Sequence, residues 1–186
     1  MAQSDGTGRK RPLRRLLTPS LYLENIYDLP FEWLYDNSIK AVITDLDNTL
    51  VPWRDYRVAD ELSGWFNNLH KEGFKTLILT NARPAPTITE LSTILNTRLV
   101  VGARKPISRF FREALKLLNS KPGETCVIGD QIFTDILGGN IIGCHTVLVE
   151  KLGRKEFAGT RVVRLIERIV RQYVDLPHWS RHEQKD

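Results

Sequence analysis

The chain has 186 residues, of which 41% are hydrophobic and 26% are charged, with a formal net charge of +5. This length and composition fit one globular domain. We expect no signal peptide, because no long apolar core follows the N-terminal arginines, and no membrane span, because no apolar run reaches the roughly 18 residues that a spanning helix needs. An Arg-rich organelle transit peptide is the alternative that stays open. The surplus of basic residues lies in residues 1–20 and 150–186, whereas residues 21–149 are slightly acidic. Basic flanks of this kind favour docking onto an anionic surface.

Residues 41–50 (AVITDLDNTL) combine a β-branched apolar run with two carboxylates in a Thr-containing turn. Side chains alternate faces along a strand, so Asp45 and Asp47 should point the same way. Two nearby anions are costly unless a cation lies between them. Oxygen ligands of this kind suit Mg²⁺, whose coordination is often completed by a substrate phosphate. The run therefore predicts a strand that ends at a metal site.

Helical and strand patterns alternate along the rest of the chain. Apolar spacing predicts helices over residues 59–72, 86–95 and 107–118 and another that begins within 132–140, and continuous apolar runs predict strands over 75–80, 98–101, 125–130 and 146–149. Gly73 should end the first of these helices in a left-handed conformation. Strands without alternation that are separated by helices indicate a parallel sheet covered on both faces. We predict a Rossmann-like three-layer α/β/α fold with no large cap domain.

Polar residues follow several of the predicted strands directly. Thr80 and Asn81 follow one, Lys105 comes shortly after another, and Asp130 ends a third. Alone, each has a simple explanation, since an Asp often caps a helix and a Thr-Asn pair often forms a turn. Ligands of such sheets bind beyond the carboxyl ends of the strands. The repeated pattern therefore predicts one site at this edge.

Cysteine and histidine add no further chemistry. Cys126 and Cys144 lack metal-ligand spacing, and we interpret them as buried thiols of a reducing compartment. The four histidines show no paired spacing that would indicate a zinc site or a catalytic triad.

These motifs resemble the haloacid-dehalogenase-like (HAD) superfamily of aspartyl-phosphate phosphatases. Residues 45–49 (DLDNT) are similar to its first motif, Thr80 to its second, Lys105 to its third, and residues 129–135 (GDQIFTD) to its fourth. The order and spacing match over roughly residues 38–150.

More narrowly, residues 43–51, 103–106 and 129–140 resemble the YqeG-like branch of subclass IIIA, which includes phosphatidylglycerophosphate phosphatases. Ile141 departs from this pattern, because a basic residue is expected after Gly-Gly-Asn. The role of that position is therefore open.

The resemblance implies a two-step phosphoryl transfer. Asp45 would be the nucleophile that forms an aspartyl-phosphate, and Asp47 would act first as general acid and then as general base. Lys105 would supply positive charge to the phosphate and to Asp45, and Thr80 would donate its hydroxyl to a phosphate oxygen.

Mg²⁺ would bridge Asp45, Asp130, a backbone carbonyl at Asp47 and a phosphate oxygen. Asp135 would support the metal through water or through a hydrogen bond to a ligand. Two further candidates for substrate binding, for which a turn-stabilising role is the alternative, are Thr49 and Asn81.

The flanking segments bear on the substrate and the location. We divide the chain into a basic N-terminal segment (1–20), a phosphatase domain (21–160), a basic amphipathic helix (161–175) and a flexible tail (176–186). The helix could pack on the domain or lie on anionic lipid. The N-terminal basic cluster and the apolar residues after it add a second indication of membrane contact. We expect a cytoplasmic protein with peripheral contact to the inner face of the membrane.

The leading prediction is a Mg²⁺-dependent phosphomonoesterase that converts phosphatidylglycerophosphate to phosphatidylglycerol in phospholipid biosynthesis. Its expected partners are a phosphorylated lipid and an anionic membrane surface, without nucleic acid. An uncapped site admits a phosphate on a large partner, but the identity of the lipid comes from the resemblance. The alternatives are a phosphatase for nucleic-acid ends, a phosphatase for soluble sugar or nucleotide phosphates, and a non-catalytic docking protein on membrane or RNA.

Overall fold

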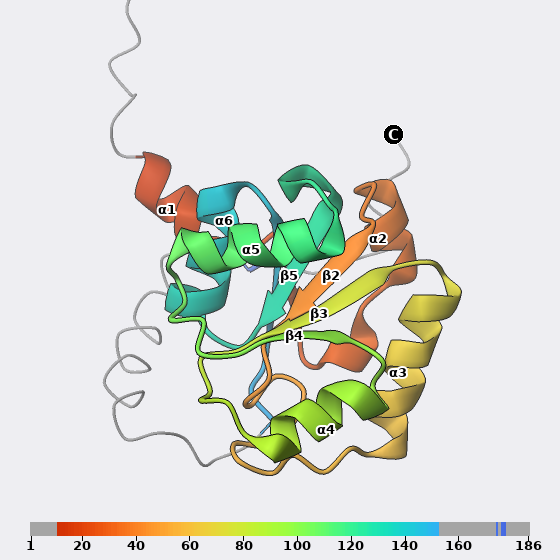
Figure 1. Cartoon of the computed structure of the whole chain (residues 1–186). Helices are drawn as coiled ribbons and strands as arrows, with labels where there is room; N and C mark the ends of the chain where they lie inside the picture. The colour runs from red at the N-terminus through yellow and green to blue at the C-terminus, as the bar shows by residue number, and fades with distance from the viewer. Residues whose placement is uncertain (1–10, 153–173, 175, 178–186) are drawn as a thin grey trace, which may run out of the picture.

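A six-stranded parallel sheet forms the centre of the computed structural model, which describes residues 11–152, 174, 176 and 177. The strand order is β1-β6-β5-β2-β3-β4 (Figure 1). The strands are β1 (Leu21–Leu23), β2 (Ala41–Thr44), β3 (Lys75–Leu79), β4 (Arg98–Val100), β5 (Thr125–Gly129) and β6 (His145–Val149). Every residue of β2 and β5 is buried, which explains why their sequences show no alternation of apolar and polar residues.

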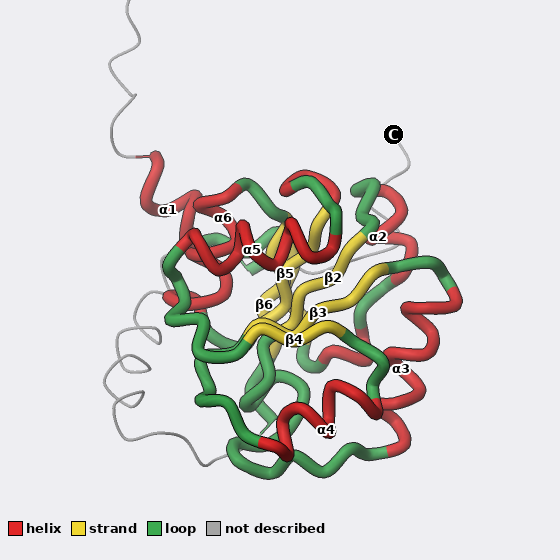
Figure 2. Tube along the Cα trace, viewed as in Figure 1, coloured by secondary structure: helices red, strands yellow, loops and turns green. Residues whose placement is uncertain are grey.

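Helices cover both faces of the sheet, so the predicted three-layer α/β fold is confirmed (Figures 1 and 2). The helices α2, α3 and α4 lie on one side, and α1, α5 and α6 lie on the other (Figure 1). Their bounds are α1 (Arg11–Leu17), α2 (Phe31–Asp36), α3 (Asp60–Lys71), α4 (Pro86–Ile94), α5 (Ser108–Leu118) and α6 (Leu137–Ile142). Short helical turns occur at η1 (Ile26–Asp28), η2 (Pro122–Glu124) and η3 (Ile132–Ile136).

The predicted elements agree with the structure within one or two residues at most ends. Gly73 follows α3 with a φ of 83°, the left-handed conformation that its position predicts. The last predicted helix differs, because it opens as a π-helical turn, η3, before α6 begins. Within the described residues, the chain between β2 and β4 forms only α3, β3, α4 and their loops, so no large cap domain is inserted there.

Residues 11–36 form four elements that the sequence analysis did not predict: α1, β1, η1 and α2. The apolar residues of this region were interpreted as support for membrane contact, and the structure corrects that interpretation. Leu21, Leu23 and Ile26 are buried in the core, where they pack beneath α2 and α3. They are therefore not available to a membrane surface.

β1 lies at one edge of the sheet and also contacts the described part of the C-terminal region. The Tyr22 N–H donates to the Pro177 carbonyl at 2.7 Å, and Val174 and Leu176 pack in a small apolar cluster with Leu17. Apart from residue 174, the predicted amphipathic helix over 161–175 lies outside the described residues, as do residues 1–10 and 178–186. No helix among residues 11–152 is both long and apolar enough to cross a bilayer.

The strand order places a topological switch point between the neighbouring strands β2 and β5. From β2 the chain adds β3 and β4 on one side, and it then returns to the other side for β5 and β6. Ligands in open α/β sheets bind beyond the carboxyl ends of the strands at such a switch point. The residues that follow β2 and β5 are therefore the first candidates for a site.

Candidate active site

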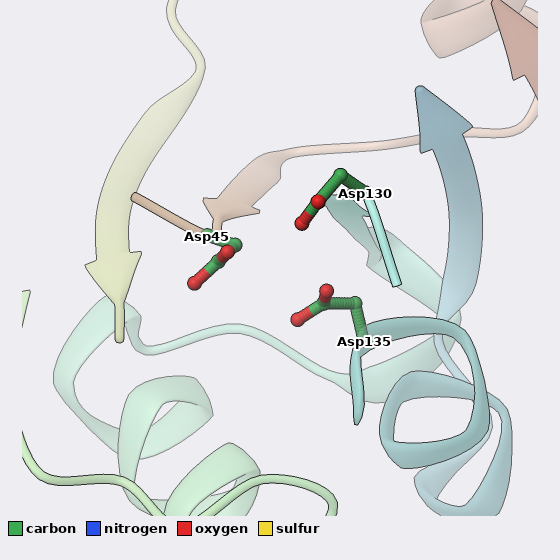
Figure 3. A group of neighbouring side chains, drawn as sticks. All are labelled: Asp45, Asp130 and Asp135. Atoms are coloured by element: carbon green, nitrogen blue, oxygen red, sulfur yellow. The ribbon is translucent and has the colours of Figure 1, made fainter. Parts of the chain in front are cut away.

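Two carboxylates stand at this switch point. Asp45 directly follows β2, and Asp130 directly follows β5, which is paired with β2 in parallel. Both side chains are buried, and Figure 3 shows their carboxylates turned toward a common space. The sheet therefore brings together two acids that lie 85 residues apart in the sequence.

Asp135 is the third carboxylate of this group, and the π-helical turn η3 carries it. The N–H groups of Asp135 and Ile136 both lie within bonding range of the Gln131 carbonyl, at 3.0 and 3.4 Å. Such π-helical turns are rare and occur often at functional sites. Here the turn contains Asp135, whose side chain points back toward Asp45 and Asp130 (Figure 3).

Gly129 leaves the space that the Asp135 carboxyl occupies. A Cβ at Gly129 would overlap the side chain of Asp135, which is itself fully buried. We expect Gly129→Ala to lower the free energy of unfolding by about 3 kcal/mol, because overpacking strains a buried site, and to reduce activity strongly by displacing Asp135. Chemical denaturation and a phosphatase assay would test this. Gly64→Ala is the matched control: nothing lies within 4 Å of its added Cβ, and alanine within α3 should raise stability by about 0.5–1 kcal/mol. Equal stability of the two variants would contradict the prediction.

Lys105 connects two of the three carboxylates. Its Nζ lies 2.5 Å from Asp45 Oδ1 and 2.6 Å from Asp135 Oδ1, and its side chain is 3% exposed. Burial opposes the charge on Lys105, but Asp135 and Asp45 outweigh that effect and raise the pKa of the ammonium. Burial raises the pKa of the Asp135 carboxyl to about 6, although Lys105 opposes the rise. The three carboxylates thus carry more negative charge than Lys105 alone neutralises.

The donor set fits a divalent cation. Asp45, Asp130 and Asp135 each offer a carboxylate oxygen, and these oxygens lie within 4.8 Å of one another. Three carboxylates and one ammonium leave a net charge of −2 when all are ionised. An all-oxygen set with this charge suits Mg²⁺. The predicted fourth contribution, the backbone carbonyl at Asp47, stays a prediction.

Asp47 lies beside this group and lines the same cleft. Its Oδ1 accepts hydrogen bonds from the Arg54 N–H at 3.2 Å and from the Tyr56 hydroxyl at 3.4 Å. Burial raises the pKa of the Asp47 carboxyl, the Arg54 N–H opposes this, and the negative charge of Asp45 adds to it. Burial, together with Asp47, raises the pKa of Tyr56 to about 12, so the phenol stays protonated and can donate.

The other predicted substrate-binding residues occupy different positions. Thr80 is buried and lines the cleft, and its Oγ1 accepts from the Ala82 N–H at 3.0 Å. Asn81 also lines the cleft, and its Oδ1 accepts from the Lys105 N–H at 2.7 Å, which fixes the backbone that carries the lysine. Thr49 lies away from the cleft lining, fully buried, with its hydroxyl 3.4 Å from Asp130 Oδ1.

A wide cleft of about 1520 Å³ opens above these groups. One wall is the loop from Trp53 to Val58, and the other is formed by residues 81–94, which include most of α4. No individual role was predicted from the sequence for the cleft residues Trp53, Arg54, Tyr56, Arg83, Gln131 and Thr134. For Trp53, Arg54, Tyr56 and Arg83, which lie in loops without periodic patterning, the only sequence signal is their position shortly after a predicted catalytic segment. Gln131 and Thr134 lie within the motif at residues 129–135.

The motif at residues 138–140 positions the N-terminal region rather than the cleft. A Cβ at Gly139 would lie 2.6 Å from Thr146 Cγ2, so α6 approaches β6 closely. Asn140 Nδ2 donates to the carbonyls of Leu16 and Thr18, each at 2.9 Å. Ile141 is exposed on α6 and is absent from the cleft lining, so its departure from the family pattern does not alter the cleft wall.

The fold and the acidic site at its switch point define a HAD-like hydrolase, and comparisons with known proteins agree. Residues 102–161 match the HAD-hydrolase-like family model. The chain is 35% identical over 156 residues to the "Probable phosphatase YqeG" of Bacillus subtilis. This match covers 84% of this chain and 90% of the relative. The chain belongs to the YqeG-like family of HAD-superfamily phosphatases.

Further relatives are more distant. The mitochondrial phosphatidylglycerophosphatase GEP4 of Saccharomyces cerevisiae is 29% identical over 148 residues, covering 72% of this chain and 78% of the relative. Among solved structures, the 3-deoxy-D-manno-octulosonate 8-phosphate phosphatase of Yersinia pestis superposes with a TM-score of 0.51 at 17% identity, covering 81% of this chain and 92% of that protein. An uncharacterized protein from Listeria monocytogenes gives a TM-score of 0.51 at 16% identity, over 72% of this chain and 99% of that one. These two structures support the fold alone.

Proposed function

We propose that the protein is a Mg²⁺-dependent phosphomonoesterase that forms a phosphoaspartate on Asp45 and acts on phosphatidylglycerophosphate. The observation that carries the catalytic part is the arrangement at the floor of the cleft. Asp45 is paired with Lys105 there, within a group of three buried carboxylates, and Asp47 lines the same cleft.

The residues divide the reaction into two balanced steps. In the first, an Asp45 carboxylate oxygen bonds to phosphorus while the bond from phosphorus to the ester oxygen breaks, and Asp47 gives its proton to the departing alkoxide. In the second, Asp47 takes a proton from a water molecule, the water oxygen bonds to phosphorus, and the bond to Asp45 breaks. The products are the alcohol and inorganic phosphate, with both acids restored.

Lys105 and Thr80 would hold the phosphate during both steps. The Lys105 ammonium is fixed between Asp45 and Asp135, so it orients the nucleophile and offers positive charge to the phosphate. When bound by Asp45, Asp130 and Asp135, Mg²⁺ would neutralise the phosphate charge that otherwise repels the nucleophile. Thr80 lines the same cleft, and its hydroxyl would donate to a phosphate oxygen.

The contacts of Asp47 suit a proton-transfer role. The two donors, the Arg54 N–H and the Tyr56 hydroxyl, both bind Oδ1. Within residues 11–152, Oδ2 receives no comparable hydrogen bond and can carry the proton. The raised pKa of Asp47 favours the protonated form that the first step requires.

Tyr56→Phe should therefore move the pH profile. The Tyr56 hydrogen bond favours the ionised Asp47 and lowers its pKa, so its loss should raise that pKa. Because the first step needs protonated Asp47, the basic limb of the kcat/KM profile should shift to higher pH. The optimum kcat/KM should fall roughly two- to tenfold, the effect of one weak hydrogen bond. Tyr35→Phe is the control, because it removes a hydroxyl that donates to the exposed Glu72, and neither residue lines the cleft. A basic limb that stays in place or moves to lower pH would contradict the role of Tyr56.

The lipid assignment has two supports. One is the resemblance to the yeast phosphatidylglycerophosphatase, at lower identity than to YqeG. The other is the open cleft, which has no inserted cap domain above it within the described residues and leaves room for a phosphate on a large headgroup. The half-buried Trp53 on one wall adds an aromatic surface of the kind that suits a membrane interface.

Phosphate release by the purified full chain tests this proposal. The substrates are phosphatidylglycerophosphate in mixed micelles, a 3′-phosphorylated oligonucleotide and a panel of sugar phosphates that includes glyceraldehyde 3-phosphate, each with Mg²⁺ and with chelator. We expect Mg²⁺-dependent release that favours the lipid. Preference for another substrate would overturn the lipid assignment and leave the chemistry intact, whereas no release from any substrate would overturn both.

A further inference from the structure

Three arginines line the walls of the cleft above the carboxylate floor. Arg54 and Arg57 belong to the loop before α3, and Arg83 belongs to the opposite wall that leads into α4. All three side chains are exposed. Their surroundings differ, and the difference separates a structural arginine from two that can bind a ligand.

Arg57 already has a carboxylate partner. Its Nε lies 2.7 Å from Asp55 Oδ1 and its Nη2 lies 2.5 Å from Asp55 Oδ2, so the pair is bidentate. Across the part of the chain that the structure describes, neither Arg54 nor Arg83 forms an ion pair. The Arg54 guanidinium instead lies 4.6 Å from the centre of the Trp53 ring, a contact that holds it in place while leaving its charge unneutralised.

Arg54 also has an unusual backbone. Its φ of 61° lies in the left-handed region, which costs a residue with a Cβ about 1–2 kcal/mol. That conformation accompanies the hydrogen bond from the Arg54 N–H to Asp47. The same residue therefore supports the proposed acid through its backbone and presents its side chain to the cleft.

The floor of the cleft has no positive charge to spare for a second anion. Lys105 lines the cleft and is shared between Asp45 and Asp135, Asp47 adds a carboxylate to the lining, and Asp130 adds another that belongs to the same buried group but lies outside the lining. One divalent cation and one doubly ionised phosphomonoester cancel each other, so this excess of negative charge stays. A second anionic group on the substrate must find its cation on the walls.

We infer that Arg54 and Arg83 form a second anion site that binds the phosphodiester of a lipid headgroup and so determines specificity. This inference rests on the proposed function and deepens it. Phosphatidylglycerophosphate carries a phosphodiester and a phosphomonoester on the two ends of one glycerol, so a cleft with carboxylates at the floor and free arginines on both walls matches its charge pattern. The planar guanidinium groups suit phosphate oxygens, which they can bind in a bidentate manner.

Soluble substrates isolate this contact from membrane binding. Glycerophosphoglycerophosphate, the deacylated headgroup, holds both phosphates, whereas glycerol 3-phosphate holds only the monoester. We expect the wild-type chain to prefer the first by at least roughly tenfold in kcat/KM. Arg54→Ala and Arg83→Ala should each reduce this preference at least roughly fivefold, the scale of one charge-assisted hydrogen bond. The Arg54 variant keeps the backbone N–H that contacts Asp47.

Arg57→Ala is the matched control, because it removes a cleft arginine whose charge Asp55 already balances. If this variant lowers the preference as much as the other two, general electrostatics explain the effect and the inference is overturned. Equal loss toward both substrates in Arg54→Ala and Arg83→Ala would also overturn it. A 3′-phosphorylated dinucleotide, which also places a phosphodiester next to its monoester, completes the series. If it is preferred over the lipid headgroup, the assignment to lipid is overturned.

A binding measurement keeps this inference separate from the proposed function. Calorimetry would measure the affinity of glycerophosphoglycerophosphate for two proteins. One carries Asp45→Asn alone, and the other carries Asp45→Asn together with Arg54→Ala and Arg83→Ala. A loss of at least roughly tenfold in affinity supports the second anion site even if the wild-type chain hydrolyses nothing, in which case the proposed function alone fails. Unchanged affinity overturns the inference, whatever the activity.

Discussion

Replacement of Asp45 by asparagine is expected to reduce Mg²⁺-dependent phosphatase turnover by at least about a thousandfold while the protein stays folded. An amide cannot form the phosphoaspartate and does not replace the charge that faces Lys105 at 2.5 Å. Folding should survive, because Lys105 keeps its partner Asp135 at 2.6 Å and one of several crowded negative charges is removed. Phosphate release and thermal unfolding of the purified variant would measure both effects.

The control for Asp45 is another acid of the same cleft. Asp55 pairs with the exposed Arg57 and lies outside the carboxylate group, so Asp55→Asn should keep most of the activity. Substantial Mg²⁺-dependent turnover by Asp45→Asn would exclude it as the nucleophile. Equal losses in the two variants would indicate a general effect of cleft charge.

Replacement of Lys105 by methionine is expected to cause the largest loss of stability. The variant leaves Asp45 and Asp135 buried without the ammonium that lies between them. Breaking a buried pair in this way typically costs about 3–5 kcal/mol, which corresponds to a fall in Tm of roughly 10 °C for a chain of this size. The loss should be smaller at pH 5 than at pH 8. Burial raises the pKa of the Asp135 carboxyl, and the removal of Lys105, which opposes this, should raise it further. A carboxyl with a raised pKa binds a proton more readily in the folded state than in the unfolded state. The free energy of unfolding of the variant should therefore fall as the pH rises from 5 to 8.

Mg²⁺ gives this experiment a second readout. A cation that binds the three carboxylates only in the folded protein stabilises the folded state by mass action, so added Mg²⁺ should recover part of the lost Tm. Lys40→Met is the control, since Lys40 pairs with Glu124 on the surface and exposed pairs contribute about 1 kcal/mol or less. If the two lysine variants are equally stable without Mg²⁺, the buried pair does not stabilise the fold more than the exposed one.

The central part of the fold was predictable because its strands are long and buried on both faces. The runs at β2, β3, β5 and β6 are continuous and apolar, and the helices between them have clear apolar spacing. β1 was not predicted, because three residues alone show only a weak pattern, whereas the equally short β4 lies between two predicted helices. It forms because the exposed edge of β6 provides a partner 126 positions away. Likewise, local spacing gives no sign that a helix will open as the π-helical turn that carries Asp135.

The candidate site also has a part that the sequence predicts and a part that it does not. Asp45, Asp130 and Lys105 follow strands within recognisable motifs, and the structure brings them together with Asp135. The cleft walls were not predictable, because loop residues such as Arg54 gain their position from tertiary contacts with Trp53 and Asp47. The carboxylate group is thus encoded locally by motifs, whereas the positions of the cleft walls depend on the folded chain.

Among the strands that the structure describes, β1 emerges from the ribosome first, and β6, the strand with which it pairs, emerges last. A nascent chain that has been translated through β5 can pair β2 with both β3 and β5, but it still exposes Leu21 and Leu23. Pairing of β1 is then a late, long-range event that closes one edge of the sheet, which is a slow kind of contact to form. During translation these apolar residues are therefore a target for chaperones and for aggregation until β6 has been synthesised.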